Sequence, residues 1–351
     1  MSSTTAIVAL GQGKAEIQTV PVPKLVPGRV LVEVKAVGLN PTDWKFIDGT
    51  KQSGVRAGCD YAGIVVDVAP DAEGGFQRGD RIAGWVHGGF SPEDGSFGGY
   101  VAARPHLQMK IPDGISFEEA ATFGVSITTV GQGLYKTLGL PLPTEPTKTP
   151  GQTVLIYGGS TATGIYGIQY AKASGFRVLA TSSPKNFELL KSLGADEVFD
   201  YKAPEVGAAI NKATDNKLLL AWDCTGMGAA VCAAALSDAE GVTPKYATII
   251  PVQREQVEKI NPRVEGPTFT LAYDCMGVPY SRLGGTHEPP PDEADYARMF
   301  WKMSRECFER GLIRPLKPDV NVGGRGLEGV LKGLDELKLG KVSAGKLVYN
   351  L

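Results

Sequence analysis

The glycine-rich segment YGGSTATGIYG, at residues 157–167, constrains the fold more than any other feature of the chain. It lies directly between an apolar, strand-like stretch (TVLIY) and a helix-like stretch (GIYGIQYAK). A turn in that position lets the backbone approach a pyrophosphate, with N–H groups and the positive end of the helix facing it. Gly158 and Gly164 fill the first and last places of a GxGxxG pattern, and Thr161 fills the middle one, where its hydroxyl has a proton to donate to a phosphate. We interpret the segment as a dinucleotide-binding turn; the alternative is a helix start that is merely rich in glycine.

Strand-like and helix-like stretches alternate from Gly151 onwards. The predicted strands span residues 153–157, 177–181, 197–199 and 218–224, and the predicted helices span residues 162–173, 185–193 and 205–212. Such alternation is typical of an α/β fold in which a parallel sheet has helices on both faces.

The second predicted strand of this region ends in ATSSPKN, residues 180–186. A site that prefers NAD usually has Asp or Glu here, which accepts a hydrogen bond from the 2′-hydroxyl of the ribose. This chain has no acid at that point and offers Ser183 and Lys185, whose donors suit a 2′-phosphate. The sequence therefore predicts NADPH rather than NADH; the alternative for Lys185 is a solvated lysine of a loop.

The first third of the chain has the pattern of strands and turns. Residues 29–38 alternate apolar with polar or small residues, and Gly, Pro and Asp clusters separate further strand candidates at residues 62–68, 81–86 and 100–103. Short strands with glycine-rich connections predict a small barrel-like domain. A chain of 351 residues is long enough for this domain and a separate nucleotide-binding domain.

Helices are predicted where the strand pattern stops. Ser116, with Glu119 three residues later, has the form of a capping box, and a second helix follows toward Leu138. Residues 140–150 show no periodicity, and we interpret them as a surface loop. Two late stretches place apolar residues on one helical face: Tyr296, Phe300, Met303 and Cys307, and then Leu327, Val330, Leu331 and Leu334.

Composition and charge exclude several classes of function. The formal net charge is −2 without any run of Lys or Arg, which argues against nucleic acid or an anionic membrane as the partner. No apolar stretch reaches the ~20 residues that a membrane-spanning helix needs, and the N-terminus lacks the pattern of a signal peptide. The 5 cysteines are scattered and odd in number, so we expect no disulfide framework and a reducing, cytoplasmic location.

A catalytic zinc site needs about three Cys, His, Asp or Glu ligands. His87, His106 and His287 stand in different segments, each without a neighbouring Cys. Cys59 and Asp60 are the sole tight pair of ligand types, and such a pair is more often structural. We therefore expect no metal, so hydride transfer would depend on the positioning of cofactor and substrate.

Motifs that follow one another nearly end to end resemble the medium-chain dehydrogenase/reductase superfamily. They are PGRVLV (27–32), GLNPTD (38–43), GCDYAG (58–63), GDR (79–81), GQTV (151–154), GAD (194–196) with DY (200–201), and GKLV (345–348). Zinc-dependent members have Cys near residues 40–42, His-Glu near residues 59–60 and a four-cysteine lobe near residues 86–99. All three features are missing here, so the chain resembles the zinc-independent quinone and enoyl reductases.

Within that branch the chain is most similar to fungal enoyl reductases of the lovastatin type, which act in trans on iterative polyketide synthases. The motifs NPTDWK (40–45), STAT (160–163) in place of the usual Gly-Gly turn, and SSPKN (182–186) carry this closer resemblance. The resemblance implies a GroES-like, β-rich catalytic domain at residues 1–124 and 292–351, and a Rossmann NADPH-binding domain at residues 125–291.

The same resemblance implies roles for individual residues. The nicotinamide end of the cofactor would be approached by Thr42 and Lys45 and covered by Val342 and Ser343. The phosphates would be held by Ser160, Thr161, Ala162 and Thr163, the 2′-phosphate by Ser183, Lys185 and Asn186, and the adenosine half would lie near Tyr201. Thr129, on the helix that starts near Val125, is a candidate for the substrate site.

These features predict a conjugate reduction. Hydride would pass from NADPH to the β-carbon of an enoyl thioester carried by a polyketide synthase, with Lys45 donating to the enolate or orienting the nicotinamide ribose. The alternative for Lys45 is an exposed lysine without a role. Two other functions stay open: reduction of free quinones or enones, and a non-catalytic, cofactor-binding scaffold docked to a synthase. Similarity to the fungal reductases leads us to expect a monomer.

Overall fold

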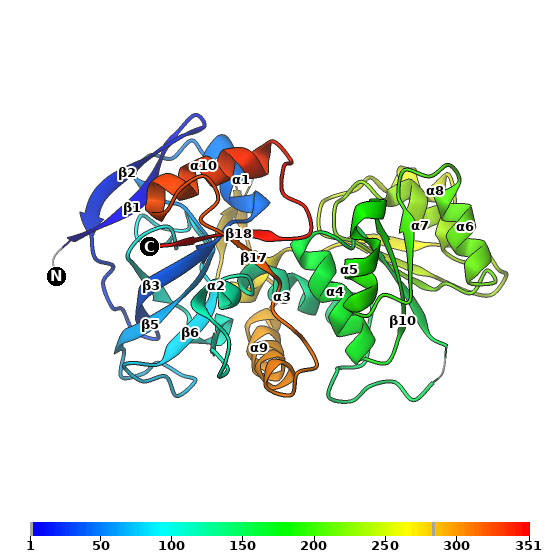
Figure 1. Ribbon diagram of the computed structural model, residues 1–351, viewed down its shortest axis with the longest axis horizontal. Coiled ribbons are helices and arrows are strands. Elements are labelled where there is room, and N and C mark those ends of the chain that lie inside the picture. The colour runs from blue at the N-terminus through cyan, green and yellow to red at the C-terminus, as the bar shows by residue number, and fades with distance from the viewer. Residues whose placement is uncertain (1–2, 150, 283–284) are drawn as a thin grey trace. The chain divides into compact units, whose positions relative to one another are not determined.

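The computed structural model describes residues 3–149, 151–282 and 285–351, which form two compact units (Figure 1). The first unit comprises the chain up to Thr128, together with Tyr273–Glu309 and Pro315–Leu351. The second unit comprises Thr129–Ala272 and Arg310–Arg314. Within the described ranges, no helix is both long enough and apolar enough to cross a membrane.

The largest difference from the predicted division concerns residues 273–291, which belong to the first unit instead of the nucleotide-binding one. Their side chains explain this. The Tyr273 ring stacks on His87 with 3.8 Å between ring centroids, and the carbonyl oxygen of Cys275 lies 3.0 Å from His106 Nε2. These contacts join residues far apart in sequence, so no local pattern indicated them.

A second, smaller difference concerns residues 310–314, which belong to the second unit. Gln169 Oε1 accepts a hydrogen bond from the Arg314 N–H at 2.8 Å, and Gln169 Nε2 donates to the Arg314 carbonyl at 3.2 Å. The buried side chain of Gln169, on α4 (Ala162–Ala173), thus holds residues 310–314 in the second unit.

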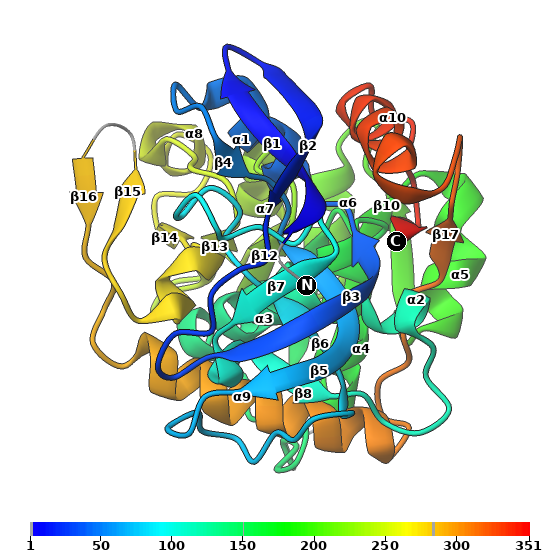
Figure 2. The same cartoon turned by 90° about the vertical axis from the view of Figure 1, so that its left-hand side faces the viewer.

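The strands of the first unit are β1 (Ser3–Gly11), β2 (Lys14–Pro21), β3 (Val30–Gly38), β4 (Val55–Arg56), β5 (Asp60–Val68), β6 (Arg81–Trp85), β7 (Tyr100–Ala103), β8 (Gln108–Lys110), β15 (Tyr280–Arg282), β16 (Gly285–His287), β17 (Pro318–Val320) and β18 (Lys346–Asn350). They form one sheet in the order β17-β18-β3-β5-β6-β8, with β7 also paired to β3, a smaller sheet in the order β2-β1-β4, and a two-stranded sheet of β15 and β16. Figure 2 shows β3, β5 and β6 side by side, with the β15–β16 hairpin apart from them. The four strands predicted in the first third are confirmed as β3, β5, β6 and β7.

The helices that lie wholly or mostly in the first unit are α1 (Pro41–Gly49), η1 (Pro105–Leu107), α2 (Phe117–Ala120), α3 (Gly124–Val130), η4 (Ala272–Met276), α9 (Glu293–Glu309) and α10 (Gly326–Lys338). The capping box is confirmed, because Ser116 Oγ accepts from the Glu119 N–H at 3.1 Å and Glu119 Oε2 accepts from the Ser116 N–H at 2.9 Å. The predicted apolar faces are those of α9 and α10, and Val330 and Leu334 of α10 pack into the core beside Val32 of β3.

The second unit contains a parallel sheet in the order β11-β10-β9-β12-β13-β14. Its strands are β9 (Thr153–Tyr157), β10 (Arg177–Ser182), β11 (Glu197–Asp200), β12 (Leu220–Asp223), β13 (Lys245–Thr248) and β14 (Glu265–Phe269). β9 is almost wholly buried, as its apolar run requires. The alternation predicted from Gly151 onwards is therefore confirmed, with boundaries that shift by one or two residues.

The helices of the second unit are η2 (Gly131–Thr137, a π-helix), α4 (Ala162–Ala173), η3 (Pro184–Asn186), α5 (Phe187–Ser192), α6 (Val206–Ala213), α7 (Ala229–Ala235) and α8 (Arg254–Glu258). Figure 1 shows α4 and α5 on one face of the sheet and α6, α7 and α8 on the other. This is the result of right-handed crossovers on both sides of β9. Residues 140–149 contain no helix or strand, in agreement with the predicted loop, and Pro150 lies outside the described residues.

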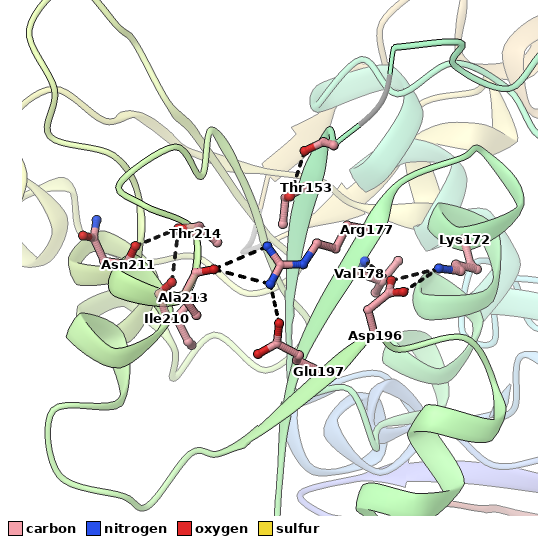
Figure 3. A network of polar contacts seen from close by, with 11 residues as sticks. Thr153, Lys172, Arg177, Val178, Asp196, Glu197, Ile210, Asn211, Ala213 and Thr214 are labelled. Carbon is pink, nitrogen blue, oxygen red and sulfur yellow. Dashed lines mark hydrogen bonds and ion pairs between the residues drawn. The ribbon is translucent and has the colours of Figure 1, made fainter.

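Polar side chains join the amino ends of β10 and β11 to α4 (Figure 3). Arg177 donates to Glu197 at the start of the neighbouring strand, and Lys172 of α4 lies 2.7 Å from an oxygen of Asp196. The other oxygen of Asp196 accepts from the Val178 N–H at 2.7 Å. These contacts fix the register of two strands and a helix at the sheet edge opposite to the glycine-rich turn.

Candidate functional site

The glycine-rich turn lies at the carboxyl end of β9, where the chain passes into α4. Gly158 has a φ of +78°, a conformation that side chains disfavour. Gly164 packs against the strand end: a Cβ there would meet the Gly158 carbonyl oxygen at 2.3 Å and Gly159 Cα at 2.9 Å. The Gly158 N–H donates to Thr181 Oγ1 at 3.0 Å and so ties the turn to β10. Both glycines therefore occupy positions that exclude a side chain, as a dinucleotide-binding turn requires.

Thr161 serves as the N-cap of α4, which differs from the predicted role of its hydroxyl. Oγ1 accepts from the Gly164 N–H at 2.9 Å and donates to the Gly158 carbonyl at 2.9 Å, so its proton is used within the turn and is not directed at a phosphate. The first turn of a helix leaves N–H groups without an intrahelical acceptor. In the described parts of the chain, those of Ala162 and Thr163 have no hydrogen-bond partner. These two groups and the helix dipole are what the turn offers to an anion.

Asp223, the last residue of β12, organises the neighbouring turn, and the sequence analysis missed it. Its buried carboxylate accepts from the Thr225 N–H at 2.8 Å, from the Gly228 N–H at 2.7 Å and from the Tyr246 hydroxyl at 2.9 Å. Thr225 then lies against the glycine-rich turn, because a Cβ on Gly158 would meet Thr225 Cγ2 at 2.5 Å. The available signal was an acid at the carboxyl end of an apolar strand. We infer that Asp223 shapes one wall of the turn.

The residues predicted to bind the 2′-phosphate gather at the carboxyl ends of β10 and β11. Asn186 is buried and its Nδ2 donates to Ser182 Oγ at 3.2 Å, whereas Lys185 is exposed. Ser183 is partly exposed and is the N-cap of η3. Tyr201, with 39% of its surface exposed, hydrogen-bonds through its N–H to the Ser182 carbonyl at 3.4 Å. The structure thus brings these four residues to the edge of the sheet where the glycine-rich turn lies.

The second unit consequently fits a dinucleotide. The close packing of Gly164 on the Gly158 carbonyl holds the start of α4 tightly against the turn, and the N–H groups of Ala162 and Thr163 have no acceptor in the described parts of the chain. The end of β10 supplies a lysine and hydroxyls where an NAD site has an acid. Thr129, predicted to line the substrate site, is a buried residue of α3 that belongs to this unit.

In the first unit, α1 positions the residues predicted to lie near the nicotinamide. Thr42 is partly exposed and its hydroxyl forms a short hydrogen bond with the hydroxyl of Tyr273. Lys45 is exposed, and its Nζ lies 5.6 Å from the centroid of the Trp44 ring. Val342 packs, half-buried, against the same core as Trp44.

Ser343 follows Val342 and is exposed. Together with Ala344 it lies in the segment between α10 and β18, where Ala344 adopts a φ of +59°. Thr42, Lys45, Val342 and Ser343 all belong to the first unit.

A buried ion pair lies behind α1. Lys346 Nζ is 2.5 Å from Asp60 Oδ2 and donates to Asn40 Oδ1 at 2.8 Å. Asp60 Oδ1 accepts from the Val125 N–H at 2.8 Å. The side chains of Lys346 and Asp60 are 2% and 0% exposed, so the two charges depend almost entirely on each other. The pair joins the starts of α1, β5, α3 and β18.

Asp43 lies beside this pair and is almost fully buried. Burial raises the pKa of its carboxyl to about 7, although the Asn40 N–H, which donates to Oδ2 at 2.7 Å, lowers it. The carboxyl also faces the thiol of Cys59, whose pKa burial raises well above its usual value. Cys59 is thus a protonated thiol between polar neighbours. In residues 3–149, 151–282 and 285–351, no group of three or more His, Cys, Asp or Glu side chains could hold a metal ion.

Tyr273 completes this polar cluster, and no sequence pattern had singled it out. Its hydroxyl faces both Thr42 and the Cys59 thiol, and its ring stacks on His87. Burial lowers the pKa of His87 to about 4, so the imidazole is neutral. His87 Nδ1 is a buried ring nitrogen without a hydrogen-bond partner among the described residues.

Comparisons with known proteins agree with this geometry. The model of the alcohol dehydrogenase GroES-like domain matches residues 26–113, and that of the zinc-binding dehydrogenase matches residues 162–241. The solved CurK enoyl reductase superposes with a TM-score of 0.76 over 100% of this chain and 99% of that chain, at 18% identity. Fold and nucleotide turn together define a medium-chain dehydrogenase/reductase with GroES-like and Rossmann domains.

Two relatives specify the family further. The chain is 42% identical to the trans-enoyl reductase resD of Aspergillus sclerotiorum, with 99% of both chains covered. It is 41% identical to the trans-enoyl reductase ACTTS2 of Alternaria alternata, with 100% of both chains covered. The protein belongs to the trans-enoyl reductase family.

Proposed function

We propose that this protein reduces an α,β-unsaturated thioester carried by a polyketide synthase, with NADPH as the hydride donor and without zinc. The observation that carries the proposal is its 42% identity, over 99% of both chains, to a trans-enoyl reductase. The glycine-rich turn of the second unit supports it, because the N–H groups of Ala162 and Thr163, which have no acceptor among the described residues, suit a diphosphate. The reaction needs no Lewis acid if donors from the protein stabilise the enolate oxygen.

The bound nucleotide would supply a hydride to the β-carbon of the substrate. The residues of this chain would hold it: Ala162 and Thr163 through their N–H groups at the diphosphate, Ser183, Lys185 and Asn186 at the 2′-phosphate, and Tyr201 near the adenosine. Ser160 would approach the phosphates from the same turn, whereas Thr161 caps α4 through its hydroxyl. Thr42, Val342 and Ser343 would face the nicotinamide, and Thr129 the acyl chain.

Removal of the cation at Lys185 tests the choice of nucleotide. We expect Lys185→Ala to weaken NADPH binding about 10- to 100-fold, because a charge-assisted hydrogen bond is worth about 1.5–3 kcal/mol. Binding of NADH, which has no 2′-phosphate, should stay within about twofold. Titration calorimetry with both nucleotides measures this. Lys191→Ala is the matched control, since Lys191 is an exposed lysine of α5 that pairs with Glu188. An equal loss for both nucleotides would contradict the assignment of Lys185.

Lys45 is proposed to donate to the enolate oxygen, or to orient the nicotinamide ribose, from its exposed position on α1. We expect Lys45→Met to lower kcat for an enoyl thioester about 10²- to 10³-fold, the usual cost of an oxyanion donor. The Kd for NADPH should change by no more than a few-fold. Lys51→Met, at another exposed lysine close to α1, is the control. Unchanged turnover in Lys45→Met would remove Lys45 from the mechanism.

The function itself is tested with a panel of acceptors and purified protein. NADPH oxidation is followed with enoyl thioesters on a carrier domain, with a free enone and with a quinone, and the products are identified by mass spectrometry. We expect saturated thioester to be the main product and the free acceptors to react at least about 10-fold more slowly. Preference for the quinone or enone would replace the proposal by reduction of free small molecules. Nucleotide binding without consumption of any acceptor would indicate a scaffold.

A further inference from the structure

The proposed reduction leaves one requirement unassigned, the source of the proton that the α-carbon takes up. Hydride addition to the β-carbon shifts the double-bond electrons toward the thioester carbonyl and forms an enolate. The enolate becomes product only when a proton reaches the α-carbon. A donor must therefore be a neutral acid that is placed beside the nicotinamide end of the site and is accessible to the substrate.

We propose that Tyr273 is this donor: its phenolic O–H breaks as the α C–H bond forms. The proposal rests on the function argued above and on the placement of Thr42 beside the nicotinamide. Tyr273 meets the geometric requirement because its hydroxyl is hydrogen-bonded to that of Thr42, on the first turn of α1. Tyr273 is partly exposed as a residue, and so is Thr42, the hydrogen-bond partner of its hydroxyl.

The surroundings of Tyr273 hold its ring in one place. The ring stacks on His87 with centroids 3.8 Å apart and planes inclined by 13°. Trp85 and Tyr280 contact it at centroid distances of 5.9 Å each. A ring fixed on three sides presents its hydroxyl in a constant direction, which is what delivery of a proton to one face of a substrate requires.

The polar groups around the hydroxyl suit the charge changes of the step. Burial raises the pKa of Tyr273 well above its usual value, so the phenol is protonated at any working pH and holds a proton for the much more basic enolate. When the proton leaves, the hydroxyl of Thr42 faces the phenolate oxygen and can donate to it. Solvent water returns the proton after the product has left.

An unpaired atom beside Tyr273 indicates that a polar group of a ligand or water belongs there. His87 Nδ1 is buried without a hydrogen-bond partner in the described residues, although buried polar atoms are normally satisfied. His87 stacks directly on the Tyr273 ring, so the unsatisfied nitrogen belongs to a ring in face-to-face contact with the proposed donor.

The test is Tyr273→Phe, which keeps the ring and its stacking and removes only the hydroxyl. We expect kcat with NADPH and an enoyl thioester to fall at least about 100-fold, within the usual 10²–10⁴ range for a general acid. The Kd for NADPH and the near-ultraviolet circular dichroism should stay those of the wild type. Tyr349→Phe is the matched control, since Tyr349 is a buried tyrosine of the same unit whose hydroxyl donates to the Val322 carbonyl at 2.8 Å. It should keep turnover within about threefold.

A stereochemical readout separates a proton donor from a merely structural tyrosine. The reaction is run in D₂O with enzyme in stoichiometric amounts, and the configuration at the α-carbon is determined by NMR, with isolated product incubated alone to measure exchange. Wild type and Tyr349→Phe should deuterate one face. Product from Tyr273→Phe should be deuterated on both faces, because water then protonates the enolate.

Three results with Tyr273→Phe would overturn the inference: unchanged kcat, reduced kcat with the facial preference retained, or no product at all with stoichiometric enzyme. The last result exceeds what loss of a general acid can cause. If the wild type itself reduces no thioester, the proposed function fails and this inference fails with it. If the wild type reduces the thioester and Tyr273→Phe behaves like the wild type, the proposed function stands. Only the role of Tyr273 as proton donor is then excluded.

Discussion

Replacement of Lys346 by Met is expected to lower the free energy of unfolding by about 3–5 kcal/mol, because it leaves the Asp60 carboxylate buried without its cation. Lys346 Nζ lies 2.5 Å from Asp60 Oδ2, and the two side chains are 2% and 0% exposed. Water cannot replace the ammonium there, and Asn40 Oδ1 loses its donor as well. Urea unfolding at neutral pH, followed by fluorescence and circular dichroism, measures the loss.

Two further variants show that burial is the cause. Lys338→Met removes a lysine of the same unit that lies 2.6 Å from Asp48 Oδ2, but both of these side chains are more than a third exposed. It should cost less than about 1 kcal/mol, as exposed ion pairs do. The double variant Asp60→Asn with Lys346→Met removes both charges and keeps an acceptor for the Val125 N–H, so part of the stability should return. Equal costs for Lys346→Met and Lys338→Met would contradict the buried ion pair.

Replacement of Gly164 by Ala is expected to weaken NADPH binding at least about 10-fold and to lower the free energy of unfolding by about 1–3 kcal/mol, the usual cost of overpacking. The added methyl group would lie 2.3 Å from the carbonyl oxygen of Gly158 and 2.9 Å from Gly159 Cα. Both obstacles are backbone atoms of the turn, so the turn itself has to move. Titration calorimetry and thermal unfolding report the two effects.

The matched control for this change is Gly49→Ala, at the end of α1. A Cβ there meets nothing within 4 Å, and Gly49 is not among the glycines with positive φ. Binding and stability should both stay close to those of the wild type, or stability should rise slightly, because Ala favours a helix over Gly. Wild-type NADPH affinity in Gly164→Ala would show that the close approach in the turn is not needed for the nucleotide.

Local patterns predicted the parts of this protein that depend on neighbouring residues. The apolar run at β9, the glycines at 158 and 164, and the spacing of α4 are contiguous, so the dinucleotide turn could be identified from the chain alone. The capping box at Ser116 and the alternating burial of β3 follow for the same reason. Thr161 is an exception. A threonine at this position suggested a hydroxyl that donates to a phosphate, but in the structure the hydroxyl caps α4.

The partners that matter most in the first unit are separated by long stretches of sequence. Lys346 and Asp60 are 286 residues apart, and Thr42 and Tyr273 are 231 residues apart. Neither pair has a spacing that a helix or strand would repeat. Asp223 was only partly predictable. The sequence shows an acid at the end of an apolar strand, but the groups that donate to its carboxylate come from the following turn and from β13.

The sequence by itself determined the α/β alternation, the nucleotide turn and the absence of an acid after β10, because each of these is written in consecutive residues whose backbone preferences and periodicity act locally. Only the tertiary structure decided which side chains meet in the core of the first unit. Burial there removes water from Asp60 and Lys346, and each of these charges is stable only because a distant segment supplies its partner.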